Sequence, residues 1–159
     1  DLAFRMGALA NDASLVARKI GEHRFGLYAS PIYLALHRPP RQPEDLLQHV
    51  AVKLLSASAQ PVKWQLIRGK TKWEGLAPGR IAVNSPGVIR QLLLEGAGIG
   101  ALPDSFALED LQLRRVVRVL PEWRLPATPV WAVMPTRRFL PAKTRAFLSH
   151  SEKFMQSDQ

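Results

Sequence analysis

The segment 81–102 constrains the fold of this chain more than any other stretch of the sequence. Residues 81–83 and 99–102 are short apolar runs typical of strands, and residues 88–95 between them place apolar side chains on one face of a helix. Ser85 is a candidate N-cap, Pro86 suits the first helical position, and Gly96 or Gly98 can end the helix in a left-handed conformation. The sequence therefore predicts a βαβ unit, and crossovers of this kind build parallel sheets.

The rest of the chain continues this alternation of strands and helices. Apolar and β-branched runs bounded by turn formers predict strands, while a capping residue followed by proline, or acid in a first turn, predicts short helices. Expected strands span residues 2–6, 15–20, 25–29, 50–55, 62–67, 70–73, 113–120 and 130–133, and expected helices span 32–37, 44–49, 104–110 and a terminal segment from Pro141. Turns are expected at Asn11-Asp12 and at 21–23, and a loop at 56–61. These patterns predict an α/β fold.

Composition restricts the kind of protein. The 159 residues suffice for one domain with a sizeable core. The absence of cysteine excludes disulfides, thiolate catalysis and cysteine-ligated metals. No apolar run approaches the roughly 18 residues needed to cross a bilayer, and the first residues lack the pattern of a signal peptide. We expect a cytoplasmic protein without membrane contact.

The formal charge of +9 does not by itself indicate a nucleic-acid-binding surface. Basic residues occur in short, scattered pairs, such as Arg18-Lys19, Arg114-Arg115 and Arg137-Arg138, rather than in one long run. A generally basic, solvated surface is therefore favoured over a dedicated nucleic-acid face, which stays open as an alternative.

Motifs of catalysis and cofactor binding are not found in the sequence. Residues 96–101 formally match G-x-G-x-x-G/A, but these glycines follow a helix and open a strand, which reverses the order of a dinucleotide site. Helix termination is the better interpretation. The 4 histidines lack metal-ligand spacing, and no serine lies in a G-x-S-x-G elbow. We expect no enzyme activity, no cofactor and no metal site.

One polar segment, Asn84-Ser85-Pro86, combines a strand end, amide and hydroxyl side chains, and the free backbone N–H groups of a helix start. Such groups together favour a small anion or a carboxylate. Taken alone, the segment is better explained as an ordinary helix cap, and the anion site stays open as the alternative.

Short blocks follow one another in an informative order over nearly the whole chain. They are residues 1–7 (DLAFRMG), 15–18 (LVAR), 28–35 (YASPIYLA), 43–46 (PEDL), 83–85 (VNS), 96–103 (GAGIGALP), 119–123 (VLPEW), 133–138 (VMPTRR) and 143–147 (KTRAF). In order and spacing these blocks resemble the effector-binding domain of LysR-type bacterial transcription regulators.

The resemblance implies two Rossmann-like subdomains, similar to type 2 periplasmic binding proteins, with an effector held in a central cleft. Residues 27–131 would form subdomain II, and residues 1–26 and 132–159 would belong to subdomain I, which would be incomplete in this chain. The expected effector-binding residues are Arg5, Met6, Gly7, Ser30, Asn84, Ser85, Pro86, Val88, Ala101, Leu102, Pro103 and Val133, with Ser30 and Val133 at the hinge. The positive helix end and the Arg5 guanidinium indicate a small organic anion as the effector.

The resemblance also implies properties of a longer parent protein. A winged helix-turn-helix without counterpart in this sequence would bind DNA, the effector would control transcription, and the parent would be a homo-oligomer, either a dimer or a tetramer. The alternatives are a periplasmic-type solute-binding protein and a sequence-independent nucleic-acid-binding module.

The resemblance further implies that early strands and helices of subdomain I are missing here. In the terminal helix, Thr144, Phe147, Leu148, Ser151, Phe154 and Met155 share one face. We expect Phe4, Phe147, Leu148 and Phe154 to lack part of their burial, which leaves residues 27–131 as the stable folding unit.

Overall fold

The computed structural model describes residues 2–7, 15–56, 58–134 and 141–157, the last four by their backbone alone. The predicted turn at Asn11-Asp12, the 135–138 block and the side chains of Phe154 and Met155 lie outside the described part. The chain divides into two compact units: unit 1 comprises Asp1–His23 and Ala127–Gln159, and unit 2 comprises Arg24–Pro126. The assignment of these units to regulatory subdomains I and II stays a prediction.

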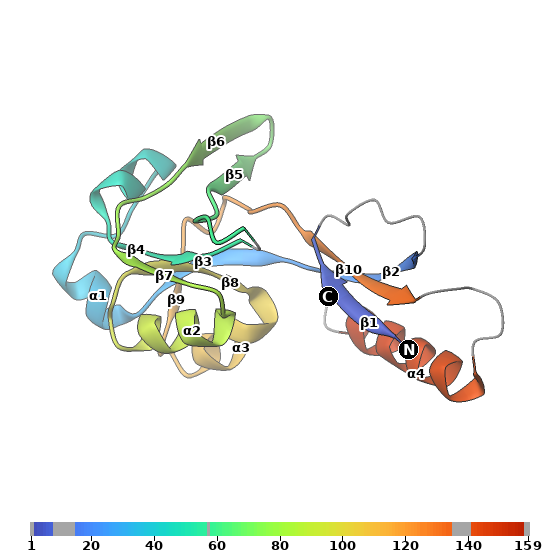
Figure 1. Ribbon diagram of the computed structural model, residues 1–159. Coiled ribbons are helices and arrows are strands. Elements are labelled where there is room, and N and C mark those ends of the chain that lie inside the picture. Colours follow the sequence, from blue (N-terminus) through green and yellow to red (C-terminus); the bar gives the residue numbers. More distant parts are fainter. Residues whose placement is uncertain (1, 8–14, 57, 135–140, 158–159) are drawn as a thin grey trace. The chain divides into compact units, whose positions relative to one another are not determined.

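Unit 1 is a small antiparallel sheet packed on one helix. Its strands are β1 (Ala3–Met6), β2 (Val16–His23) and β10 (Thr128–Met134), in the order β1-β10-β2. Helix α4 (Ala142–Ser157) packs against β2 (Figure 1). The core of unit 1 consists of Ile20, Val130, Ala132, Met134 and Leu148.

The turn expected at 21–23 is wrong, because β2 continues through it to His23. Residues Gly21, Glu22 and His23 pair with Val130, Pro129 and Thr128 of β10, past a register shift at Val130/Trp131. Cross-strand pairing along β10 thus overrides the local turn preference of these residues.

The expected loss of burial in unit 1 holds for two of the side chains that the structure describes. Phe4 and Phe147 are about half exposed, and their rings lie 5.9 Å apart between centroids. Leu148 contradicts the expectation, because only 3% of it is exposed. It lies on the face of α4 that packs against the sheet, whereas Phe147 lies one position away on the helix.

Unit 2 contains a mixed five-stranded sheet in the order β7-β4-β8-β3-β9. Its strands are β3 (Phe25–Ala29), β4 (Ala51–Leu54), β7 (Ile81–Val83), β8 (Ile99–Pro103) and β9 (Val117–Val119). Strand β4 is parallel to β7 and β8, while β3 is antiparallel to β8 and β9. The α/β class predicted from the sequence is confirmed.

The βαβ unit at 81–102 is confirmed, with helix α2 at Pro86–Leu94 between β7 and β8. The two strands are parallel but not adjacent, since β4 lies between them. Gly96 has a φ of +78°, which is the left-handed conformation expected of the glycine that ends the helix.

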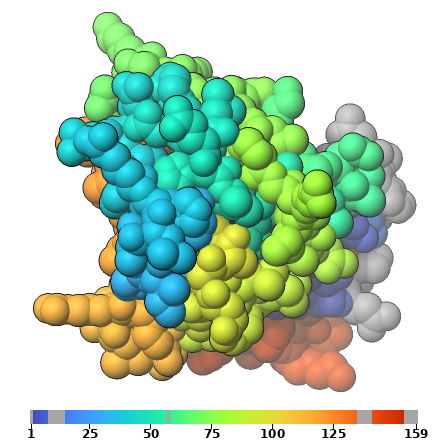
Figure 2. Space-filling model, turned by 90° about the vertical axis from the view of Figure 1, so that its left-hand side faces the viewer, coloured from blue at the N-terminus to red at the C-terminus, as the bar shows by residue number. Residues whose placement is uncertain are grey.

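Two layers cover the five-stranded sheet of unit 2. Helices α2 and α3 (Asp104–Gln112) pack on one face, over a core that includes Tyr28, Val52 and Leu102. On the other face lie α1 (Pro31–Leu36), the 3-10 helix η1 (Pro43–Gln48) and the hairpin β5–β6 (Trp64–Arg68 and Thr71–Gly75). In Figure 2, α1 and η1 occupy neighbouring patches of the surface in blue to teal.

Two expected strands differ from those observed. The strand predicted at 113–120 is limited to Val117–Val119, because the Asp110 carbonyl accepts the N–H groups of Arg115 and Val116 and so holds the chain in a turn after α3. The strand predicted at 62–67 forms β5, which pairs with β6 in a separate sheet rather than joining β4. Local pattern does not specify a strand's partner.

Candidate functional site

The candidate site in unit 2 is the sheet edge at which its parallel strands end. Because β4, β7 and β8 run in the same direction, the segment after Val83 and the end of β8 at Pro103 lie at one edge. Helix α2 also begins there, directly after Asn84 and Ser85. The structure therefore brings the predicted residues Asn84, Ser85, Pro86 and Val88 to the same edge of the sheet as the predicted residues 101–103.

Ser85 occupies the N-cap position of α2 without acting as a side-chain cap. Its φ and ψ of −130° and 122° are extended, as usual for this position, but its hydroxyl makes no capping hydrogen bond. Pro86 occupies the first turn as predicted. The first-turn N–H groups of Gly87 and Val88 have no intrahelical acceptor, as at every helix start. The hydroxyl and these N–H groups are thus available to a ligand.

Accessibility separates the predicted residues of this edge into two groups. Asn84 and Val88 are exposed, and Ser85, Pro86 and Ala101 are partly exposed. Leu102 and Pro103 are buried, and Leu102 belongs to the core beneath α2 and α3. Leu102 and Pro103 therefore support the candidate site from below, and the side chains of Asn84, Ser85, Pro86 and Val88 form its surface.

Ser30 lies at the opposite edge of the sheet. Strand β3 is antiparallel to β8, and Ser30 follows its last residue. Only 1% of Ser30 is exposed, and its Oγ accepts the Tyr33 N–H at 3.3 Å as the cap of α1. The structure does not bring Ser30 together with the residues at the start of α2.

In unit 1, the predicted residues Arg5, Met6 and Gly7 lie at the end of β1. Arg5 and Met6 are exposed and pair with Trp131 and Val130 of β10. The Trp131 indole N–H donates to the Gly7 carbonyl at 2.9 Å, which secures this end of the strand. The other predicted residue of unit 1, Val133, is buried within β10 opposite Ala3 and Ala17 and lies away from this end.

Unit 1 also contains a cavity of about 530 Å³ between its sheet and α4. Its walls are mainly apolar, and Met6 alone among them was expected in a site. The lining residues are Phe4, Met6, Ile20, His23, Val130, His150 and Ser151. Sequence reasoning missed the others, because strands β1, β2 and β10 and helix α4 contribute them from distant parts of the chain.

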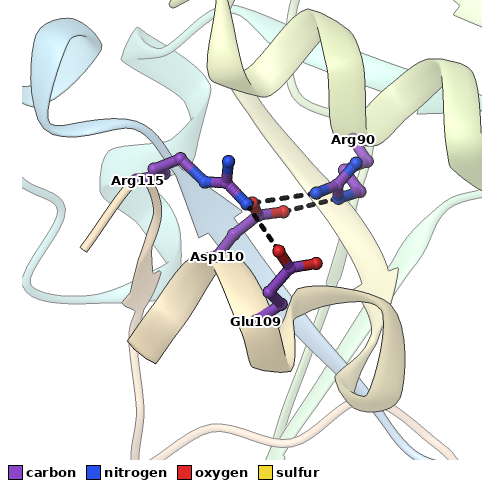
Figure 3. A network of polar contacts seen from close by, with 4 residues as sticks. All are labelled: Arg90, Glu109, Asp110 and Arg115. Atoms are coloured by element: carbon purple, nitrogen blue, oxygen red, sulfur yellow. Dashed lines mark hydrogen bonds and ion pairs between the residues drawn. The ribbon is translucent and has the colours of Figure 1, made fainter. Parts of the chain in front are cut away.

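A buried carboxylate joins α2 to α3 (Figure 3). Asp110 is fully buried, and its two oxygens accept hydrogen bonds from the Arg90 guanidinium of α2 at 2.5 and 2.9 Å. Arg115 lies 2.7 Å from Asp110 and 3.3 Å from Glu109. Hydrogen bonding to Asp110 raises the pKa of Arg90 above its ordinary value. This network fixes α2, and with it the helix start that forms the candidate site.

A second polar cluster follows directly after Pro103. Asp104, the first residue of α3, accepts a hydrogen bond from the Tyr28 hydroxyl at 2.8 Å and one from Arg118 at 3.3 Å. Burial, and then the hydrogen bond to Asp104, raise the pKa of Tyr28. Because Arg118 lies beside the Asp104 carboxylate, the negative charge at this edge is partly compensated.

Comparison with known proteins identifies the family. Residues 1–156 match the family model of the LysR substrate binding domain. The HTH-type transcriptional regulator PtxR of Pseudomonas aeruginosa is 33% identical over 148 residues, which are 93% of this chain and 47% of that protein. The chain therefore belongs to the LysR substrate-binding domain family, and it is an effector-binding domain of the LysR-type transcription regulators.

Solved structures agree with this assignment. The full-length structure of the Vibrio cholerae virulence activator AphB is similar to this chain with a TM-score of 0.82 and 31% identity, over 98% of this chain and 52% of that one. For CrgA, a LysR-type transcriptional regulator from Neisseria meningitidis, the TM-score is 0.81 and the identity 25%, over 98% and 52%. The chain thus spans about half the length of the relatives it matches.

None of the helices in the described ranges is long and apolar enough to cross a membrane. Within those same ranges, no group of three or more His, Asp or Glu side chains is arranged to hold a metal ion.

Proposed function

We propose that this domain senses a small organic anion at the amino end of α2 and that the bound effector controls DNA binding and transcription by the parent regulator in the cytoplasm. The parent protein would bind DNA through a winged helix-turn-helix and act as a homo-oligomer, dimer or tetramer, as the family resemblance implies.

The observation that carries the proposal is the uncapped start of α2. The Ser85 hydroxyl is not used by the helix, and two first-turn N–H groups lie beside it at the positive end of the helix dipole. Asn84 adds an exposed amide. Donors in this arrangement suit a carboxylate better than a neutral or cationic ligand. The Arg90 to Asp110 pairing holds α2 in place, so that the donors are preorganised.

Replacement of Ser85 by alanine is expected to weaken binding of the effector about 10-fold or more, because a hydrogen bond to a charged group contributes ~1.5–3 kcal/mol. The ligand would first be selected from a panel of small organic carboxylates by thermal shift of the complete regulator, and its affinity then measured by calorimetry. Ser105→Ala is the matched control, since Ser105 is an exposed serine in the first turn of α3. Equal affinity in Ser85→Ala and the wild type would reject this site.

The contribution of Arg5 stays a prediction from the sequence, and Arg5→Ala in the same calorimetric series tests it separately. A guanidinium that bonds the carboxylate should also contribute at least 10-fold to the affinity. If Ser85→Ala weakens binding and Arg5→Ala does not, the effector is held by unit 2 without Arg5.

DNA binding by this chain tests the proposal that another part of the parent protein recognises DNA. We expect the isolated chain to bind duplex DNA weakly and without sequence preference, through its +9 charge, and to release it at moderate salt. Fluorescence anisotropy with specific and scrambled duplexes over a salt series measures this. Sequence-specific binding by this chain would contradict the assignment of DNA recognition to another part of the parent.

A further inference from the structure

Two histidines and a tyrosine form a cluster on unit 2, on the side of the sheet covered by α1 and η1. The ring of Tyr33 in α1 stacks on His37 with 4.2 Å between centroids, and the His37 and His49 rings are 6.4 Å apart. His49 directly follows η1 and is 7% exposed. The segment between the two histidines carries Pro43 and Leu46, both of which are buried under the sheet.

The Tyr33 hydroxyl contacts two other groups of this cluster. Its oxygen accepts the Val50 backbone N–H at 3.0 Å, and it lies 3.1 Å from His49 Nδ1, to which it can donate when that nitrogen carries no hydrogen. The backbone of Arg38 also acts on the His49 ring and favours its charged form. A neutral imidazole has one N–H donor and one acceptor. His49 fits the cluster when neutral, with Nδ1 as the acceptor.

Protonation of His49 would break this arrangement. Imidazolium has no acceptor nitrogen, so the Tyr33 hydroxyl could no longer donate to Nδ1 and its hydrogen would have to turn away. The charged ring would also be largely buried, with the His37 ring centroid 6.4 Å away. Asp45 in η1 is the one acidic group that acts on His49 among the described residues, and it favours the charged ring. The side chain of Asp45 already accepts the backbone N–H groups of Arg41 and Gln42, at 2.8 and 3.1 Å.

We propose that Tyr33, His37 and His49 form a proton-sensitive latch that fastens the segment 37–50 to unit 2 and releases it locally when His49 is protonated. The latch joins α1 and the end of η1, which lie on one side of the sheet, to the start of the sheet strand β4 (Figures 1 and 2). It lies at the edge opposite the start of α2, and it gives the domain a response to acid that does not depend on the effector.

The direction of the pH effect on stability follows from the protonation state of His49 that the fold favours. Burial, and then the nearby His37, lower the pKa of His49 below its ordinary value near 6.5. The folded state therefore favours the neutral ring. The preference for the neutral ring stabilises the fold fully above about pH 6.5, the ordinary pKa that His49 has in the unfolded chain. This stabilisation is lost as the pH falls through the lower pKa that His49 has in the folded chain.

Hydrogen exchange of the whole chain at a series of pH values, corrected for the intrinsic pH dependence of amide exchange, tests the latch. Between about pH 7.5 and pH 5, protection at Leu46 and Val50 should fall by about 2- to 10-fold, the range expected for the loss of one hydrogen bond. Protection at Leu93, in α2, should stay constant. Constant protection at Leu46 and Val50 as well would overturn the proposal.

Two variants and one direct measurement separate the latch from a general effect of acid. In His49→Gln, whose side chain does not titrate, hydrogen-exchange protection at Leu46 and Val50 should no longer fall as the pH is lowered. His150→Gln, in α4 of unit 1, should still show this fall. If His49→Gln does not fold, Tyr33→Phe is used in its place, and protection of the Val50 amide should then be low at every pH. Nitrogen-15 NMR of the wild type should show His49 with its hydrogen on Nε2 at about pH 7.5. A hydrogen on Nδ1, or a decline that persists in His49→Gln, would contradict the latch.

Discussion

Replacement of Gly98 by alanine is expected to lower the free energy of unfolding by about 3–5 kcal/mol, as the sum of backbone strain and overpacking. Gly98 has a φ of +151°, a conformation that residues with a side chain rarely adopt. An added Cβ would overlap the carbonyl oxygen of Val50 at the start of β4. That same oxygen accepts the Ile99 N–H at 2.9 Å, so it cannot withdraw without loss of a hydrogen bond between β4 and β8. Urea denaturation monitored by tryptophan fluorescence measures the change.

Gly69→Ala is the matched control for Gly98→Ala. Gly69, between β5 and β6, also has a positive φ, +58°, but no atom lies within 4 Å of an added Cβ. Gly69→Ala should lower the free energy of unfolding by only about 1 kcal/mol, the cost of holding alanine at a positive φ. If the two variants lose equal stability, the close approach of β8 to β4 at Gly98 is not the cause.

Replacement of Asp110 by asparagine is expected to destabilise the domain by about 2–4 kcal/mol, somewhat less than a fully buried ion pair because both arginines are partly exposed. The variant keeps the size of the side chain but removes the charge that Arg90 and Arg115 share. One guanidinium then loses its acceptor, and the polar contact between α2 and α3 is weakened. The change would be measured by urea denaturation of the whole chain.

Glu109→Gln is the control for Asp110→Asn, because Glu109 precedes it on α3 and also contacts Arg115, at 3.3 Å, but is largely exposed. Exposed ion pairs contribute ~0–1 kcal/mol, so this control should change stability little. Asp110→Asn should also speed hydrogen exchange in α2 more than in β3, since Arg90 is anchored to α2. A uniform change over both elements would contradict a local role in fixing α2.

The sequence predicted most of the local elements and the surface of the candidate site. The βαβ unit at 81–102, the proline at the start of α2 and the left-handed Gly96 follow from short-range rules and are confirmed. The candidate residues Asn84, Ser85, Pro86 and Val88 were expected because polar groups at a helix start carry the same chemistry in any fold. Their effector remains a proposal, and Ser85 does not form the expected cap.

The sequence could not predict which strand each strand pairs with. Residues 21–23 look like a turn, yet β10 extends β2 through them, because backbone pairing with a distant strand outweighs a weak local preference. Ser30 was expected at the hinge of the same site as Ser85, but the antiparallel direction of β3 puts it at the opposite edge of the sheet. Strand direction is a property of the whole sheet and has no local signature.

The sequence by itself determined the class of fold, the family and the position of the helix start at α2, because these depend on residue types at short spacings. The tertiary structure alone decided the contacts between residues far apart in the chain. Arg90 meets Asp110, and Tyr33 meets His49, only because their elements pack on the same faces of one sheet. Hydrogen-bond direction, burial and charge pairing in these clusters arise from packing in three dimensions, which the order of residues specifies only through the complete fold.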